Sequence, residues 1–196
     1  MTELLFLRHG ATEWNREKRL QGRSDIPLLE SEVERLRQQQ LPARLADFNW
    51  ISSPLIRAHQ TAEALALTFE ADQSVIEMNF GDWEGKTLSA IRQQDPEAVA
   101  ENEDRGWDFR PEGGESPREV ARRLQEFLKA RSTHHHKLGL VTHKGVIRVA
   151  MALATGWDML GKPSVKLDWS ALHLFRLTSG GAIELLEANI PLEPRP

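Results

Sequence analysis

The chain contains no cysteine and no long run of apolar residues. Without cysteine it cannot form a disulfide framework, a thiolate zinc site or a cysteine nucleophile, and this composition fits a reducing cytosol. No apolar stretch approaches the roughly 20 residues that a membrane span requires. The first apolar run, Leu4–Leu7, ends at an arginine and is too short for the apolar region of a signal peptide. These absences predict a cytoplasmic protein.

The chain also lacks a strong charge of one sign, since its net charge is only −4 over 196 residues. Nucleic acids and membrane surfaces attract proteins with a strong positive field, so neither is expected as a partner. Hydrophobic residues make up 40% and charged residues 28% of the chain, which is the balance of a globular protein. The length fits a single domain, residues 1–196, with a substantial core.

Three short apolar runs predict strands that are buried on both faces, namely Leu4–Leu7, Phe48–Ile51 and Leu138–Val141. A hairpin is predicted near the end of the chain, where residues 171–177 and 182–186 flank a Ser-Gly-Gly turn. Helical patterns lie between these strands. The alternation predicts an α/β fold, a three-layer α/β/α sandwich around a mostly parallel mixed sheet with one antiparallel strand.

The predicted helices have distinct start signals. Ser53-Pro54 is typical of an N-cap followed by proline at the first helical position, and Ser116–Glu119 is a capping box. A third helix is predicted over Glu30–Leu45 and a fourth from about Gly145. Residues 86–115 break the alternation because they are rich in charge, weak in periodicity and end in a proline–glycine turn. We expect an insertion with short helices that covers the active site.

Basic and imidazole side chains follow the predicted strand ends. Arg8 and His9 come directly after the first strand, and His143 follows the strand at Leu138–Val141. If these strands are parallel, both histidines emerge at the carboxyl edge of the sheet, where open α/β sheets bind ligands. Arg57 lies in the first turn of its helix, where a cation costs roughly 0.3–1 kcal/mol unless an anion compensates. A bound phosphate would provide that compensation.

Taken singly, a histidine after a strand is more often structural than catalytic, and an arginine near a helix start is usually solvated. The convergence of Arg8, His9, Arg57 and His143 on one predicted edge favours a functional site instead. The run His134–His136 resembles a metal-binding tract, but its place between a helix and a strand favours a solvated loop.

Four segments together resemble the motifs of the histidine phosphatase superfamily, in the branch that includes cofactor-dependent phosphoglycerate mutase. They occur in the family's order, span most of the chain, and comprise Leu7–Asn15, Ser52–Ala62, Glu77–Gly85 and Val141–Gly145. The third of them, together with the Gly-Gly-Glu-Ser segment at 113–116, is similar to the α-ribazole phosphatases and broad-specificity phosphatases of this branch. The resemblance implies the phosphoglycerate-mutase-like form of the α/β sandwich.

The resemblance implies that His9 is the nucleophile and that the reaction passes through a phosphohistidine. The attack requires a neutral imidazole, which Arg8 and Arg57 would favour by opposing the protonation of His9. The same arginines, with His143, are implied to hold the phosphoryl oxygens. Glu77 matches the general acid, which would protonate the leaving oxygen and later deprotonate the attacking water.

The resemblance also implies residues that bind substrate beside these catalytic groups. Asn15, Gln21 and Gly22 match positions that face the phosphate, and Lys144 faces either the substrate or solvent. The sequence contains no phosphate-binding loop of the nucleotide hydrolases and no obvious carboxylate cluster for magnesium, so no metal and no cofactor are expected. The expected partner is a small phosphorylated metabolite, and a homodimer is left open.

Three functions are compatible with these motifs. The first is a phosphatase that hydrolyses a small phosphomonoester, and the alternative is a phosphoglycerate mutase that passes the phosphate to a substrate hydroxyl. True mutases of the family tend to be longer and carry a histidine-tyrosine-glycine pattern in place of Phe80–Glu84, so this chain resembles the phosphatases. A catalytically silent phosphate-binding module is the third, and the presence of both His9 and Glu77 argues against it.

Overall fold

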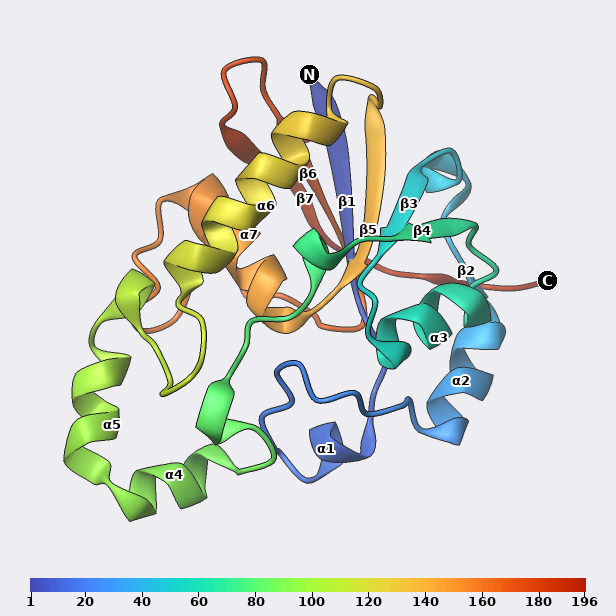
Figure 1. The fold of residues 1–196 in the computed structure, drawn as a ribbon. Helices are drawn as coiled ribbons and strands as arrows, with labels where there is room; N and C mark the ends of the chain where they lie inside the picture. The colour runs from blue at the N-terminus through green and yellow to red at the C-terminus, as the bar shows by residue number, and fades with distance from the viewer.

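The computed structural model describes all residues, Met1–Pro196, and its core is a six-stranded sheet in the order β4-β3-β5-β1-β6-β7 (Figure 1). The strands are β1 (Thr2–Arg8), β3 (Asn49–Ser52), β4 (Phe69–Ala71), β5 (Lys137–Thr142), β6 (Leu172–Leu177) and β7 (Ile183–Ile190). β6 pairs antiparallel with both β1 and β7, whereas β1, β5, β3 and β4 pair in parallel. β6 therefore runs against the other five strands, which confirms the predicted mixed sheet with one antiparallel strand.

Helices cover both faces of the sheet, as Figure 1 shows. The four longest elements of these layers are α2 (Glu30–Arg37), α3 (Ile56–Ala64), α6 (Pro117–Arg131) and α7 (Lys144–Thr155). Side chains alternate along β1, so Leu4 and Phe6 pack in the core beneath α6 and α7, whereas Leu5 and Leu7 pack in the core beneath α2 and α3. Because both faces of β1 are buried, the three predicted layers are confirmed.

Shorter elements complete the chain. They are α1 (Glu13–Arg16), α4 (Leu88–Gln94), α5 (Pro96–Glu103), the 3₁₀ turns Ala43–Leu45, Gln73–Val75, Gly81–Trp83 and Gly106–Asp108, and a small sheet of β2 (Gln39–Gln40) with β8 (Glu193–Pro194). α4 and α5 supply the short helices expected within residues 86–115. They lie beyond the end of the sheet at which β1 stops, on the same side as α1 (Figure 1). No helix combines the length and the apolar character needed to cross a bilayer.

The predicted start of α3 is wrong by two residues. The helix begins at Ile56, because Leu55 is extended (φ −70°, ψ 137°). The hydroxyl of Ser53 accepts a hydrogen bond from the N–H of Leu55 (3.3 Å), which forms a serine turn before the helix instead of a cap on it. Asp25 fills the vacant capping role by accepting the N–H of Ile56 at 2.7 Å. Arg57 remains in the first turn, as predicted.

The predicted end of α2 is also wrong. The helix stops at Arg37, and Gln39–Gln40 pair with β8 instead of continuing it to Leu45. Proline cannot donate a backbone hydrogen bond inside a helix, so Pro42 opposes the longer helix that was predicted to Leu45. In contrast, the predicted capping box of α6 is present, since Ser116 and Glu119 each bind the other's backbone N–H.

Candidate active site

Three parallel strands end side by side at the edge where the site lies. The N–H of His9, just after β1, donates to the carbonyl of Thr142 at 2.9 Å. The N–H of Ser53, just after β3, donates to the carbonyl of Val141 at 2.9 Å. The rings of His9 and His143 consequently face each other, with 5.1 Å between their centroids. The prediction that the two histidines meet at the carboxyl edge is confirmed.

The imidazole of His9 is held in one tautomer by its own backbone. Its Nδ1 lies 2.7 Å from the carbonyl oxygen of Gly10, and a carbonyl can only accept, so Nδ1 carries the proton. Nε2 makes no hydrogen bond with the protein and keeps its lone pair when the ring is neutral. Gly10 is fixed in turn, because its N–H donates to the hydroxyl of Thr61 at 2.9 Å. The site therefore presents Nε2 as the free nitrogen.

The surroundings of His9 also favour the neutral ring. Burial lowers the pKa of His9 well below its usual value, and the positive charges of Arg8 and Arg57 lower it further. Only 4% of the residue is exposed. A ring that stays unprotonated at neutral pH retains a nucleophilic nitrogen.

Arg57 is fully buried at the start of α3 and is positioned by a neighbouring loop. Its Nη1 donates to the carbonyl of Ser24 and its Nη2 donates to the carbonyl of Gly22, both at 2.7 Å. Its Nε has no partner in the protein, and neither has Nε of Arg8. The fully buried Arg57 and the half-buried Arg8, each with an unused Nε donor, form a site suited to an anion beside His9.

Glu84 was not predicted to be a site residue, yet it holds the loop that positions Arg57. Its carboxylate accepts the backbone N–H groups of Arg23 (2.8 Å) and Ser24 (2.9 Å) and the hydroxyl of Ser24 (2.6 Å). It also accepts the N–H of Phe80 at 3.2 Å, and so joins two loops. Gly22 has a positive φ of 51°, and a Cβ there would overlap the Glu84 carboxylate. Glu84 lies within the family-like segment Glu77–Gly85, but a sequence motif does not show which loop a side chain contacts.

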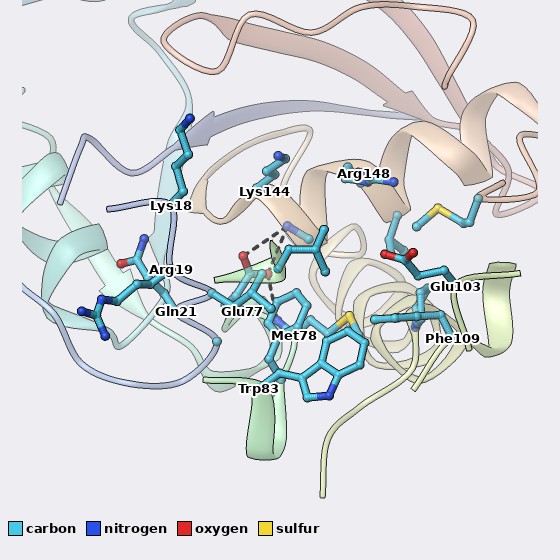
Figure 2. Close-up of a pocket in the computed structure, with 18 of the residues that line it drawn as sticks. Lys18, Arg19, Gln21, Glu77, Met78, Trp83, Glu103, Phe109, Lys144 and Arg148 are labelled. Atoms are coloured by element: carbon cyan, nitrogen blue, oxygen red, sulfur yellow. Dashed lines mark hydrogen bonds between the residues drawn. The ribbon is translucent and has the colours of Figure 1, made fainter. Parts of the chain in front are cut away.

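Glu77 is buried against the start of α7, where Figure 2 shows its hydrogen bonds as dashed lines. Its carboxylate accepts the N–H of Met78 at 2.8 Å and the N–H of Gly145 at 3.1 Å. Burial raises the pKa of Glu77, while these two donors and the charges of Arg57 and Arg123 oppose the rise. The net effect is a raised pKa, so Glu77 is protonated up to a higher pH than an ordinary glutamate.

His143 lies behind His9 and does not line the cavity. Its Nε2 is 2.7 Å from the hydroxyl of Ser53, and its Nδ1 is buried without a partner. The Ser53 oxygen also accepts the N–H of Leu55 at 3.3 Å, so this hydroxyl links His143 to the turn before α3. The Ser53 hydroxyl thus orients His143. The sequence had instead predicted that Ser53 caps a helix.

The other candidate substrate residues all line the cavity. Asn15 is the third residue of α1, and its Oδ1 accepts the N–H of Thr12 at 3.0 Å. The hydroxyl of Thr12 lies 2.9 Å from Oε1 of Gln21, so both amide side chains are fixed by one threonine. Gly22 offers its carbonyl to Arg57, and Lys144 opens α7 with its side chain exposed toward the cavity.

One cavity of about 910 Å³ joins these groups. Eight of the nine candidate residues line it, and His143 is the exception. Figure 2 shows Lys144 and Arg148 projecting from α7 on one side of it, Lys18 and Arg19 at another, and Trp83 and Phe109 opposite α7. Lining residues from α4 and α5 include Leu88, Arg92 and Glu103. No group of three or more histidine, cysteine, aspartate and glutamate side chains is placed to hold a metal ion.

An α/β sheet with two histidines and two arginines at its carboxyl edge is typical of a phosphate-handling protein. The family model for branch 1 of the histidine phosphatase superfamily matches residues 4–190, so the chain belongs to this superfamily of phosphatases and mutases. The family resemblance inferred from the four sequence segments is confirmed.

The names of individual relatives refer both to phosphatases and to phosphoglycerate mutases. Glucosyl-3-phosphoglycerate phosphatase of Mycobacterium tuberculosis is 30% identical over 179 residues, which are 81% of this chain and 79% of the relative. Phosphoglycerate mutase-like protein 4 of Arabidopsis thaliana is 32% identical over 194 residues, 91% of this chain and 80% of the relative. The chain spans only 35% of the length of a bifunctional protein of Mycobacterium tuberculosis, to which it is 37% identical over 134 residues.

Solved structures support the same fold. The mycobacterial glucosyl-3-phosphoglycerate phosphatase in complex with VO3 has a TM-score of 0.75 at 25% identity, over 97% of this chain and 100% of that one. A putative alpha-ribazole-5'-P phosphatase from Escherichia coli has a TM-score of 0.78 at 23% identity, over 98% of this chain and 99% of that one. The second likeness shows the fold alone.

Proposed function

We propose that this protein is a phosphomonoesterase that transfers the phosphoryl group of a small-molecule ester first to His9 and then to water. The observation that carries the proposal is the Nδ1–H···O=C bond of His9 to Gly10 at 2.7 Å, because it leaves Nε2 as the free nucleophile. The positive charges of Arg8 and Arg57 beside this ring support the neutral form that attack requires, because they lower the pKa of His9.

In the first step Nε2 of His9 attacks phosphorus, and the N–P bond forms as the bond from phosphorus to the ester oxygen breaks. Glu77 gives its proton to that leaving oxygen, which departs as an alcohol. The raised pKa of Glu77 supports this role, since a carboxyl that is protonated near the working pH is an effective acid. Its carboxylate then accepts the N–H groups of Met78 and Gly145.

In the second step Glu77 takes a proton from water, whose oxygen attacks the phosphohistidine. The new bond from oxygen to phosphorus forms as the N–P bond breaks, which releases phosphate and restores neutral His9 and protonated Glu77. Charge on the phosphoryl oxygens is met by the unused guanidinium donors of Arg8 and Arg57.

A panel of phosphomonoesters, with release of inorganic phosphate as the readout, tests the hydrolase. We expect turnover by the native chain, a loss of at least about 10³-fold in His9→Ala, and normal turnover in His134→Ala, whose histidine is exposed in a loop. Full activity of His9→Ala would refute the mechanism. Binding of phosphate without turnover of any ester would instead show a silent module.

The alternative function, a phosphoglycerate mutase, appears in the name of a relative in Salmonella paratyphi C, a probable phosphoglycerate mutase that is 32% identical over 144 residues. Hydrolysis and mutase transfer differ in the acceptor of the phosphoryl group, so they are compared directly with 3-phosphoglycerate and 2,3-bisphosphoglycerate as substrates. We expect phosphate release to exceed isomerisation for the ester that is turned over fastest. Isomerisation faster than phosphate release would favour the mutase. Activity is expected to survive a strong chelator, and a loss that magnesium or zinc restores would contradict the proposed residue roles.

A further inference from the structure

The cations that line the cavity fall into two groups. Arg57, Arg19 and Arg92 are engaged with the protein, Arg57 with carbonyl oxygens, Arg19 with Glu17 and Gly85, and Arg92 with Glu103. The side chains of four others form neither a hydrogen bond nor an ion pair with any residue of the chain, namely Arg8, Lys18, Lys144 and Arg148. Arg8 belongs to the phosphoryl site, whereas Lys144 and Arg148 both belong to α7. Both nevertheless have fixed places, because each lies over a tryptophan ring.

Two of the unpaired cations, Lys144 and Arg148, share one face of α7. Arg148 follows Lys144 by four residues, so the two side chains lie one above the other on the helix surface. Lys144 Nζ is 5.3 Å from the ring centroid of Trp169, and the Arg148 guanidinium is 4.9 Å from that of Trp157. Cation–π contacts of this kind hold the side chain while leaving its N–H donors available for an anion. Figure 2 shows both side chains on the α7 side of the cavity.

The position of Glu77 places these cations beside the leaving group. Its carboxylate binds the N–H of Gly145, so an ester oxygen that Glu77 protonates lies close to the first turn of α7. Atoms attached to that oxygen then continue along the cavity-facing side of the helix, past Lys144 and Arg148. The cavity volume of about 910 Å³ leaves room for a leaving group well beyond the phosphoryl site.

The acidic residues of the cavity do not neutralise this pair. Glu103 is bound by Arg92 at 2.7 and 2.9 Å. Asp104 is exposed at the rim, and Glu77 is committed to the N–H groups of Met78 and Gly145. Burial lowers the pKa values of Lys144 and Arg148, and Glu77 is the one acid that opposes the effect on each. Two unpaired cations that face a cavity favour binding of an anion.

Building on the proposed phosphomonoesterase function, we propose that Lys144 and Arg148 form a second anion subsite, which selects esters whose leaving group carries its own carboxylate or phosphate. This subsite adjoins the phosphoryl site, because Arg8 and Lys144 both lie over the ring of Trp169, at 5.9 and 5.3 Å from its centroid. It determines specificity and takes no part in the transfer of the phosphoryl group.

The test uses phosphate esters of ω-hydroxyalkanoic acids with three to six carbons, each paired with its carboxamide, and bisphosphates of alkanediols of the same lengths. For at least one chain length, we expect kcat/KM for an anionic ester to exceed that for its neutral carboxamide by about tenfold. The carboxylate and bisphosphate series show which anion the subsite takes. Absence of a preference for either anion at every length would overturn the proposal.

Variants identify the residues responsible. The preference is the ratio of kcat/KM for the anionic ester to that for its carboxamide. We expect this ratio to fall toward one in Arg148→Gln and to decrease in Lys144→Gln, whereas Arg148→Lys retains part of the preference. Arg122→Gln removes the same charge from an exposed position on α6 and is expected to keep the full preference. An anion preference that persists in both glutamine variants would assign it to other cations. A thermal melt of each variant verifies that it is folded.

The proposal and the hydrolase mechanism can fail independently. p-Nitrophenyl phosphate has no second anion, so its hydrolysis by the native chain, lost in His9→Ala, tests the mechanism alone. If this ester is hydrolysed through His9 but no anion preference is found, the subsite proposal is wrong and the mechanism stands. If no ester is hydrolysed, the proposed function is wrong.

Discussion

The carboxylate of Glu77 accepts the backbone N–H of Gly145 at 3.1 Å, and this contact ties the candidate acid to the first turn of α7. His143 immediately precedes that turn, and its ring lies 5.1 Å from that of His9. One helix start therefore positions the acid, the second histidine and the proposed anion subsite relative to the nucleophile.

Gly145→Ala tests the close approach of Glu77 to α7. A Cβ at this position would overlap Oε1 of Glu77, which must move away from its present place. We expect kcat to fall by about 10- to 100-fold, because a displacement of about 1 Å can have an effect of this size. Alanine favours helix over glycine, so the free energy of unfolding should change by less than about 1 kcal/mol. Gly180→Ala, with open space around it, is the control and should retain full activity.

The pH dependence of kcat/KM follows from two shifted pKa values. His9 must be neutral, and its pKa is lowered, so activity falls only when the pH drops well below 6.5. Glu77 must be protonated, and its pKa is raised above the usual 4.5. Activity therefore falls as the pH rises through the raised pKa of Glu77. We expect a bell-shaped profile displaced to the acid side of neutrality. A profile that continues to rise above pH 8 would contradict these roles.

Arg123→Gln should move the basic limb of that profile. The charge of Arg123 lowers the pKa of Glu77, and Arg123 also pairs with Glu115 at 3.2 Å. The variant removes a cation and leaves the Glu115 carboxylate with Arg23 as its remaining charged partner, and both changes raise the pKa of Glu77. The limb should therefore shift to higher pH. Arg122→Gln, on the exposed side of α6, should leave it in place, and a downward shift in Arg123→Gln would refute the coupling.

Glu84→Gln tests the junction between the two loops at the site. The neutral amide loses the charge that strengthens the bonds from the N–H groups of Arg23 and Ser24, at a cost of about 1–3 kcal/mol in unfolding free energy. Because that loop positions Arg57, KM should rise as well. Urea unfolding and steady-state kinetics measure both effects. Glu63→Gln, exposed on α3, should change neither.

His173 should make the fold sensitive to acid. Burial lowers its pKa to about 4, and its Nε2 has no partner. Between the unfolded value near 6.5 and pH 4 the unfolded chain binds more protons, so stability falls as the pH falls through this window. His173 should contribute a loss of about 3 kcal/mol at pH 4 relative to pH 7. Urea unfolding at both pH values should show a smaller loss in His173→Gln, and an equal loss would exclude this residue as a cause.

The layered fold was predictable because its signals are local. Leu4–Leu7 reads as a buried strand, and β1 has both faces covered. The parallel order then follows from short apolar strands separated by helices, which is why His9 and His143 could be predicted to meet. The capping box at Ser116 was likewise visible in four consecutive residues.

Contacts between distant segments could not be predicted in the same way. Ser53 has the sequence of a helix cap, yet its hydroxyl binds His143, which is 90 residues away. Glu84 lies in a recognised motif, but its partners are loop N–H groups about 60 residues earlier. Arg148 had a signal that was overlooked, since it lies one helical turn after Lys144 on the same face.

Trapping of the covalent intermediate tests the central claim most directly. The protein is mixed briefly with a labelled phosphomonoester, quenched in base and mapped by mass spectrometry and ³¹P NMR. The account predicts acid-labile, base-stable phosphate on His9 at Nε2, because Nδ1 is occupied by its bond to Gly10. Phosphate on Nδ1, on another residue, or on no residue during active turnover would contradict it.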